Sequence, residues 1–89
     1  MNRVRRKELA RIAAKLEELE ALRSEIQEEL EAVMDEEQEA FDIMPESLEY
    51  SERGEQMQEY IDAMQYALDD LENLDLESIA DQLGEICEA

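Results

Sequence analysis

Apolar residues, with two polar exceptions, recur at alternating spacings of three and four throughout the first half of the chain. The repeat comprises Leu9, Ile12, Leu16, Leu19, Arg23, Ile26, Leu30, Val33, Glu37, Ala40 and Met44. A seven-residue pattern of this kind places its members along one face of an α-helix. Leu22, Met34 and Phe41 widen this apolar stripe, which favours packing against more than one neighbouring helix. The pattern predicts one long helix over residues 3–42.

Pro45 interrupts the helical pattern. A proline cannot continue helical hydrogen bonding, and it biases the preceding residue, Met44, away from the helical conformation. Residues 43–51 therefore form a predicted connection. We expect Leu48 and Tyr50 in this connection to fold over the end of the apolar core.

A second helix is predicted over residues 52–87. Ser47 and Ser51 are candidate N-caps, and Gly54 marks either a weak point or a close approach to the first helix. The apolar residues of this segment keep the same spacing at first and then continue one step out of phase: Met57, Ile61, Met64, Leu68 and Leu71, then Ile79, Leu83 and Ile86.

The region around Asn73 has two readings. Leu68 and Ile79 are eleven residues apart, a spacing that a straight helix keeps on one face. The preferred prediction is therefore one long helix with a local irregularity. The alternative is a break at 73–75, followed by a short third helix over residues 76–87.

The predicted fold class is all-α. The chain has two Gly, one Pro and no run of β-branched residues. Two long helices with a short link predict an antiparallel, coiled-coil-like helical hairpin, a single domain over residues 1–89. The wide stripes further predict a homodimer that forms a four-helix bundle. Arg23 and Glu37 lie in the stripe, where buried polar residues can fix register or oligomeric state; alternatively, both side chains extend to solvent.

An antiparallel hairpin with its turn near residue 47 gives the basic N-terminal segment an internal role. In this register residue i lies near residue 94 − i, so bases of the first helix face acids near the C-terminus. The expected sets are Arg5, Arg6 and Lys7 against Glu85 and Glu88, and Arg11 and Lys15 against Asp81 and Glu77. We expect these bases to neutralise the acidic C-terminal segment and to fix the register.

The charge is unevenly distributed along the chain, whose net charge is −19. Residues 1–24 hold seven bases and four acids, whereas residues 25–89 hold one base and 23 acids. Such a field repels nucleic acid and anionic membranes, and it attracts basic proteins that bind them. No apolar stretch of about 20 residues could cross a membrane, and the N-terminus lacks the apolar segment of a signal peptide. The predicted location is the cytoplasm.

The residues for enzymatic chemistry are scarce. There is no His, Cys87 is the single cysteine, and no glycine-rich phosphate loop is present. The acidic runs at 35–37 and 69–72 do not match a calcium loop. We therefore expect no enzyme activity, catalytic residue, metal or cofactor.

The candidate functional residues are carboxylates that recur every three, four or seven residues, away from the apolar stripe. They are Glu25, Glu28, Glu29, Asp35, Glu36, Glu39, Asp42, Glu52, Glu55, Glu59, Asp62, Asp69 and Asp70. Rows of this kind on a rigid helix can imitate a nucleic-acid backbone. They predict an inhibitor that docks on the basic surface of a nuclease or defence complex. Tyr50 and Arg53 are weaker candidates for contacts at the turn.

The same sequence allows a structural reading. In it, the acidity serves only solubility, and an adaptor surface joins a partner helix or a second copy of the chain. Met57, Tyr60, Met64 and Tyr66 would form that surface together with the apolar stripe.

Residues 35–55, DEEQEAFDIMPESLEYSERGE, followed by Met57 through Leu71, resemble a group of short acidic proteins from phages and mobile elements of Gram-positive bacteria. Phe41 through Gly54 is the most specific part of the match. The resemblance implies a helical hairpin of phage or mobile-element origin, and it supplies no activity or site residue. For a small acidic phage protein, we expect interference with host machinery that acts on nucleic acid, such as restriction enzymes, RNA-guided nucleases or repair nucleases.

Overall fold

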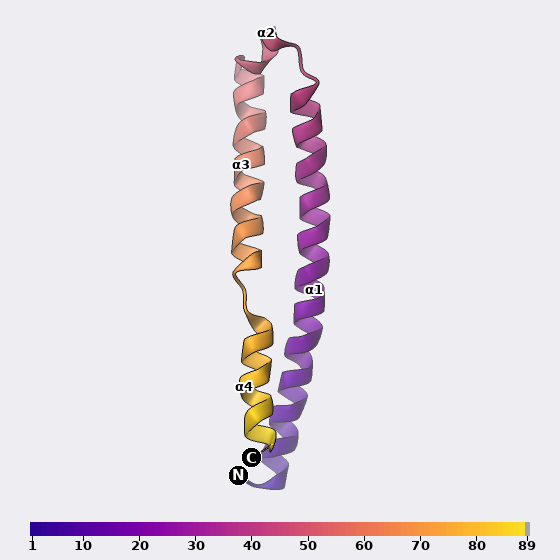
Figure 1. The fold of residues 1–89 in the computed structure, drawn as a ribbon, viewed down its shortest axis with the longest axis vertical. Coiled ribbons are helices and arrows are strands. Elements are labelled where there is room, and N and C mark those ends of the chain that lie inside the picture. The colour runs from indigo at the N-terminus through magenta and orange to yellow at the C-terminus, as the bar shows by residue number, and fades with distance from the viewer. Residues whose placement is uncertain (89) are drawn as a thin grey trace. The chain divides into compact units, whose positions relative to one another are not determined.

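The computed structural model describes residues 1–88, and this part of the chain is helical, without a strand. Its elements are α1 (Arg3–Asp42), α2 (Glu46–Glu49), α3 (Glu52–Glu72) and α4 (Leu76–Glu88) (Figure 1). The all-α class and the long first helix over residues 3–42 are confirmed. Asn2 begins α1, because its Oδ1 accepts a hydrogen bond from the Arg5 backbone N–H at 2.9 Å.

The chain divides into two compact units, and α1 contributes to both. Unit 1 comprises Met1–Glu25 and Leu74–Ala89, and unit 2 comprises Ile26–Asn73. Within unit 1 the first part of α1 lies beside α4, and within unit 2 the remainder of α1 lies beside α3; each pair is antiparallel (Figure 1). The grouping of all 89 residues into one hairpin domain stays a prediction.

The face of α1 that packs against the neighbouring helices is rotated from the predicted apolar stripe. The half-buried side chains also follow a spacing of three and four: Arg6, Leu9, Ala13, Leu16, Glu20, Arg23, Gln27, Leu30, Met34, Glu37, Phe41 and Met44. Half of the predicted stripe belongs to this face. The other large members of the stripe, Ile12, Leu19, Ile26 and Val33, are 44–53% exposed. The sequence thus located the helix correctly, but only one flank of its apolar stripe faces the neighbouring helix.

The connection holds the short helix α2. Pro45 precedes it, and the Pro45 carbonyl accepts hydrogen bonds from the backbone N–H groups of Leu48 and Glu49. Leu48 is 43% exposed and Tyr50 is 86% exposed. The prediction that these two side chains cover the end of the core is therefore wrong, because the turn of α2 directs them to solvent.

Ser51 and Gly54 join α2 to α3. Ser51 caps α3, since its Oγ accepts a hydrogen bond from the Gly54 N–H at 3.4 Å. Gly54 is buried, and a Cβ placed on it would lie 2.6 Å from the Leu48 carbonyl oxygen and closer still to that of Glu49. The close approach expected at Gly54 is thus to α2, and not to the first helix.

The second half of the chain has the break that was the alternative reading. Helix α3 ends at Glu72, and the Asn73 N–H donates to the Asp69 carbonyl at 3.1 Å. Asp75 then begins α4, because its Oδ1 accepts a hydrogen bond from the Ser78 N–H at 3.1 Å. A side-chain carboxylate that binds a backbone N–H replaces the carbonyl of a continuing helix. This cap explains why the preferred reading of one continuous helix differs from the structure.

Candidate functional site

The acidity of the protein belongs almost wholly to unit 2. Residues 26–73 carry 17 acids and one base, Arg53, a net charge of −16. The residues of unit 1 carry seven bases and ten acids, a net charge of −3, and the two units together make up −19. The division into units therefore coincides with a division of charge.

All thirteen predicted partner-binding carboxylates are exposed. Glu25 belongs to unit 1, and the other twelve belong to unit 2. None of the thirteen lies in the packed row of α1, and none is among the packed residues of α3, of which Gly54, Ile61 and Leu68 are buried. They therefore lie on the exposed faces of α1 and α3, away from the packed rows, and none of them is on α4.

The density of this charge resembles that of a nucleic acid. Helix α3 has 21 residues, which extend about 31 Å at about 1.5 Å per residue. Unit 2 thus carries one net negative charge for about every 2 Å along α3, compared with one per about 1.7 Å of axis in duplex DNA. Because almost no base interrupts the rows, a basic partner would meet a continuous polyanion.

Glutamines orient three of the exposed carboxylates. The side-chain amide nitrogens of Gln38, Gln58 and Gln65 donate to Oδ1 of the aspartate four residues later, each at 3.0 Å. Asp42, Asp62 and Asp69 accept these bonds. A Lys at the same spacing would also hold the carboxylate, but it would cancel its charge. The repeated Gln-x-x-x-Asp spacing is visible in the sequence. The sequence analysis singled out the three aspartates but missed the three glutamines that hold them.

The turn candidates lie in the open. Tyr50 is 86% exposed, which excludes the simpler reading that it caps the core. Arg53 is exposed, and within residues 1–88 it makes no ion pair with Glu49 or Asp42. Both side chains are therefore accessible to a partner of unit 2.

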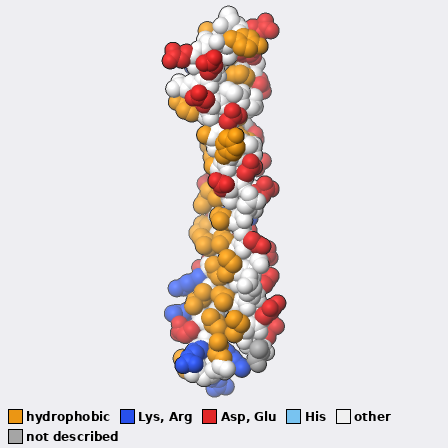
Figure 2. All heavy atoms as spheres, turned by 90° about the vertical axis from the view of Figure 1, so that its left-hand side faces the viewer, with side chains coloured by type: hydrophobic (Ala, Val, Ile, Leu, Met, Phe, Trp, Pro, Cys, Tyr) orange, Lys and Arg blue, Asp and Glu red, His pale blue; other side chains and the backbone are white. Residues whose placement is uncertain are grey.

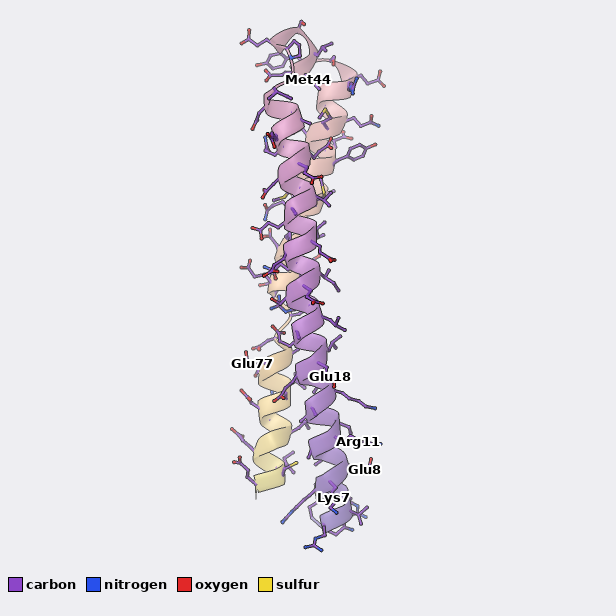
Figure 3. All side chains as sticks on the ribbon, turned by 90° about the vertical axis from the view of Figure 1, so that its right-hand side faces the viewer. Lys7, Glu8, Arg11, Glu18, Met44 and Glu77 are labelled. Atoms are coloured by element: carbon purple, nitrogen blue, oxygen red, sulfur yellow. The ribbon has the colours of Figure 1, made fainter. Side chains whose placement is uncertain are left out.

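A contact in unit 1 fits the predicted register, but within residues 1–88 the bases of α1 make no ion pair with the acids of α4. The Cys87 Sγ lies 3.4 Å from the Arg6 carbonyl oxygen, which places the end of α4 beside the start of α1. Arg11 instead pairs with Glu8 of its own helix at 2.7 Å, on the side of α1 turned away from α4 (Figure 3). An i,i+3 pair within one helix needs less ordering than a pair between helices. Opposite the predicted partners Asp81 and Glu77, the hollow between the two helices is lined by acids, Glu17 and Glu20.

Arg23 is held by Glu20. Its Nε donates to both carboxylate oxygens, at 3.0 and 2.9 Å, and the two side chains are 17% and 27% exposed. The hydrogen bond from Arg23 lowers the pKa of the Glu20 carboxyl from its ordinary value. Arg23 therefore lies half-buried in a local pair, and it does not extend freely to solvent; Glu37 is also half-buried.

Among residues 1–88 there is no group of three or more Cys, Asp or Glu side chains that could hold a metal ion. None of the helices in this part of the chain is long and apolar enough to cross a membrane. On the adaptor surface, Tyr60 and Tyr66 are 53% and 71% exposed, whereas Met57 and Met64 are half-buried.

The chain matches no protein-family model, and comparison with curated proteins and with solved structures gave no match.

Proposed function

We propose that unit 2 is a polyanionic docking surface for a basic protein that binds nucleic acid. The observation that carries this proposal is the confinement of charge: 17 acids and one base occupy one unit, and the twelve candidate carboxylates of that unit are exposed. A surface that served only solubility would be expected to mix both signs. The absence of Lys from unit 2 also costs stability, since like charges four residues apart destabilise a helix by about 0.2–0.5 kcal/mol per pair.

Such a surface acts by competition. The cationic channel of a nuclease binds a polyanion chiefly through Lys and Arg, so a rigid polyanion of similar charge density occupies the same channel. Because the attraction is between exposed charges, it speeds association and weakens as salt is added. The protein then inhibits its target without chemistry of its own.

The resemblance of residues 35–55 to short acidic phage proteins supports a bacterial host as the setting of this activity. Under the proposal, the protein works in the cytoplasm as a non-enzymatic inhibitor of a host defence or DNA-processing protein. It needs no cofactor, and its partner is a nuclease or a defence complex. Like-charge repulsion excludes direct binding of nucleic acid.

A capture experiment with three baits tests the proposal. The first bait is the unchanged chain. The second carries Glu28→Gln, Glu29→Gln, Asp35→Asn and Glu36→Gln, which remove four charges from unit 2. The third carries Glu17→Gln, Glu18→Gln, Asp81→Asn and Glu88→Gln, which remove four charges from exposed positions of unit 1.

The proposal expects a Gram-positive lysate to supply a nucleic-acid-binding protein that is retained by the first and third baits, lost from the second, and released by added duplex DNA. Circular dichroism must show that the second bait keeps its helicity, because removal of like-charge neighbours relieves repulsion. Equal retention of every captured protein by the second and third baits would contradict the proposal.

The adaptor reading is a second candidate, favoured by the exposure of Tyr60 and Tyr66. Replacing both with Gln leaves the carboxylates unchanged. An adaptor would lose its partner after this change and would tolerate the four changes on unit 2. A polyanionic inhibitor would show the reverse.

A further inference from the structure

Unit 1 leaves large apolar side chains uncovered. The exposed residues of unit 1 include Ile12 (44%), Leu19 (47%) and Leu22 (52%) from α1, and Leu74 (49%), Ile79 (46%) and Ile86 (41%) from the C-terminal segment. Met1 and Val4, at the start of the chain, are also exposed but lie outside the row of Ile12 and Leu19. In Figure 2, a strip of hydrophobic side chains runs beside basic side chains where unit 1 lies. The row of Ile12 and Leu19 continues into unit 2 with the exposed Ile26 and Val33, where almost every charged residue is acidic. The buried core of a single copy is small: within residues 1–88, Ile61, Leu68 and Ala80 are its buried hydrophobic residues.

The helical positions of four of these residues put them on one side of the pair. In α1, Ile12 and Leu19 each follow a packed leucine, Leu9 or Leu16, by three residues. In α4, Ile79 and Ile86 likewise follow Leu76 and Leu83 by three. Because α1 and α4 are antiparallel and use the same seven-residue pattern, equivalent flanking rows lie on the same side of the pair. We call this side, defined by Ile12, Leu19, Ile79 and Ile86, the apolar side of unit 1.

The opposite side of unit 1 is different in character. It has one hollow lined by the acids Glu17, Glu20, Glu77 and Asp81, and another, nearer the chain ends, where Arg3, Lys7 and Ala10 lie beside Cys87. The contact between the helices itself uses small residues, since Ala80 is 4% exposed and Ala13 is half-buried. Leucines of both helices pack beside these alanines, and a second apolar row flanks the contact on the open side. Two adjacent apolar rows are typical of helices in a four-helix bundle, where each helix packs against more than one neighbour.

The charges of unit 1 indicate what covers this side. Residues 3–15 of α1 hold six bases and one acid, whereas residues 75–88 hold five acids and no base. Within residues 1–88, Arg11 is the only one of those six bases in an ion pair, and its partner is on α1 itself. A second copy of the chain offers an identical apolar side with the same division of charge. Opposite charges meet when α1 of each copy lies on α4 of the other, and like charges meet in the reverse arrangement.

We propose that unit 1 is a dimerisation module. Two copies pack their apolar sides together around a two-fold axis parallel to the helices, and α1 of one copy lies against α4 of its partner. The result is a four-helix bundle made by unit 1, which holds two strongly acidic units 2 in one assembly. This inference does not depend on the proposed binding of unit 2 to a basic protein.

Sedimentation equilibrium of the full chain tests the interface. The test variant carries Ile12→Gln and Ile79→Gln on the apolar side. The control carries Ala14→Gln and Ala21→Gln, at exposed positions of α1 outside both packed and flanking rows.

The wild type and the control should be dimers. The test variant should dissociate with a dimer dissociation constant raised by about a hundredfold or more, because four buried isoleucines are lost per dimer. A wild type that stays monomeric at every concentration would show that the apolar side takes a different occupant, and a test variant that dimerises like the control would place the interface elsewhere; either overturns the proposal.

Cross-linking tests the arrangement. Ile12→Cys chains are mixed with Ile79→Cys chains, both with Cys87→Ser, and the mixture is oxidised. The proposed two-fold axis brings residue 12 of one copy beside residue 79 of the other, so disulfides should join unlike chains. Products that join only like chains, or no linked product from a dimeric sample, would overturn the arrangement.

Discussion

Gly54 shows how a single residue fixes the turn between helices. Its position leaves no room for a Cβ, because the Leu48 and Glu49 carbonyl oxygens of α2 lie against it. Gly84, in α4, has no heavy atom within 4 Å of the place where a Cβ would be. A methyl group therefore fits at Gly84 but not at Gly54.

The change Gly54→Ala should destabilise the protein by about 1–3 kcal/mol, because the turn must open to admit the methyl group. The matched change Gly84→Ala should stabilise it by about 0.5–1 kcal/mol, since alanine loses less backbone entropy in a helix. Denaturant unfolding followed by circular dichroism measures both. Changes of the same sign at the two positions would contradict the packing described for Gly54.

A second prediction at the residue scale concerns Glu20 and pH. Arg23 lowers the pKa of the Glu20 carboxyl below its ordinary value of 4.5, so the ionised form is favoured in the folded state. The resulting stability is fully present above pH 4.5 and is lost as the pH falls through the lowered pKa. The stability difference between wild type and Glu20→Gln should therefore be constant near neutrality and should shrink in acid. Glu18→Gln, at an exposed neighbouring position, is the control; a pH-independent difference for Glu20→Gln would contradict the pairing.

At the scale of elements, the sequence predicts a helix well where its pattern is continuous. The bounds of α1 follow from an uninterrupted repeat and from Pro45, and both signals are local. The preferred prediction of one continuous helix through Asn73 was wrong, because the eleven-residue spacing from Leu68 to Ile79 suits a straight helix but does not require one. A side-chain cap at Asp75 decides between a continuous and a broken helix, and cap geometry is not contained in apolar spacing.

The sequence also did not predict which flank of the apolar stripe is buried. The pattern defines the apolar side of α1 as a whole, whereas the neighbour's small residues, such as Ala80, determine how closely the helices approach and which flank is covered. The exposed carboxylates were predicted more reliably, because a charged residue outside the packed rows has no alternative to solvent.

The change Asp75→Ala should weaken α4. Loss of an N-cap costs about 0.5–2 kcal/mol, and a helix of 13 residues has little stability apart from its packing. Amide hydrogen exchange of α4 should accelerate, with little change in α3. Asp81→Ala, in the middle of α4 and beside other acids, is the control and should be neutral or stabilising. Equal acceleration by both changes would argue against the cap.

At the scale of the whole molecule, the two proposals assign self-association to unit 1 and binding of a basic partner to unit 2. Unit 1 has nearly balanced charge and an apolar side, and unit 2 has a net charge of −16. Added salt should therefore affect the two differently. Self-association through unit 1 should be maintained, because it depends chiefly on apolar burial, and salt screens the repulsion between the two units 2 as well as the attraction between α1 and α4 of the two copies. Binding of a basic partner through unit 2 should weaken.

The most direct test of the central claim is a competition between the protein and duplex DNA for a basic protein captured by unit 2, measured by displacement of fluorescent DNA over a range of salt concentrations. The unchanged chain and the unit 1 variant (Glu17→Gln, Glu18→Gln, Asp81→Asn, Glu88→Gln) should displace the DNA, and their affinity should fall steeply as salt is added. The unit 2 variant (Glu28→Gln, Glu29→Gln, Asp35→Asn, Glu36→Gln) should bind more weakly at low salt and should depend less on salt. Binding by the unit 2 variant with unchanged affinity and unchanged salt dependence would contradict the claim that the acidic faces of unit 2 are the functional site.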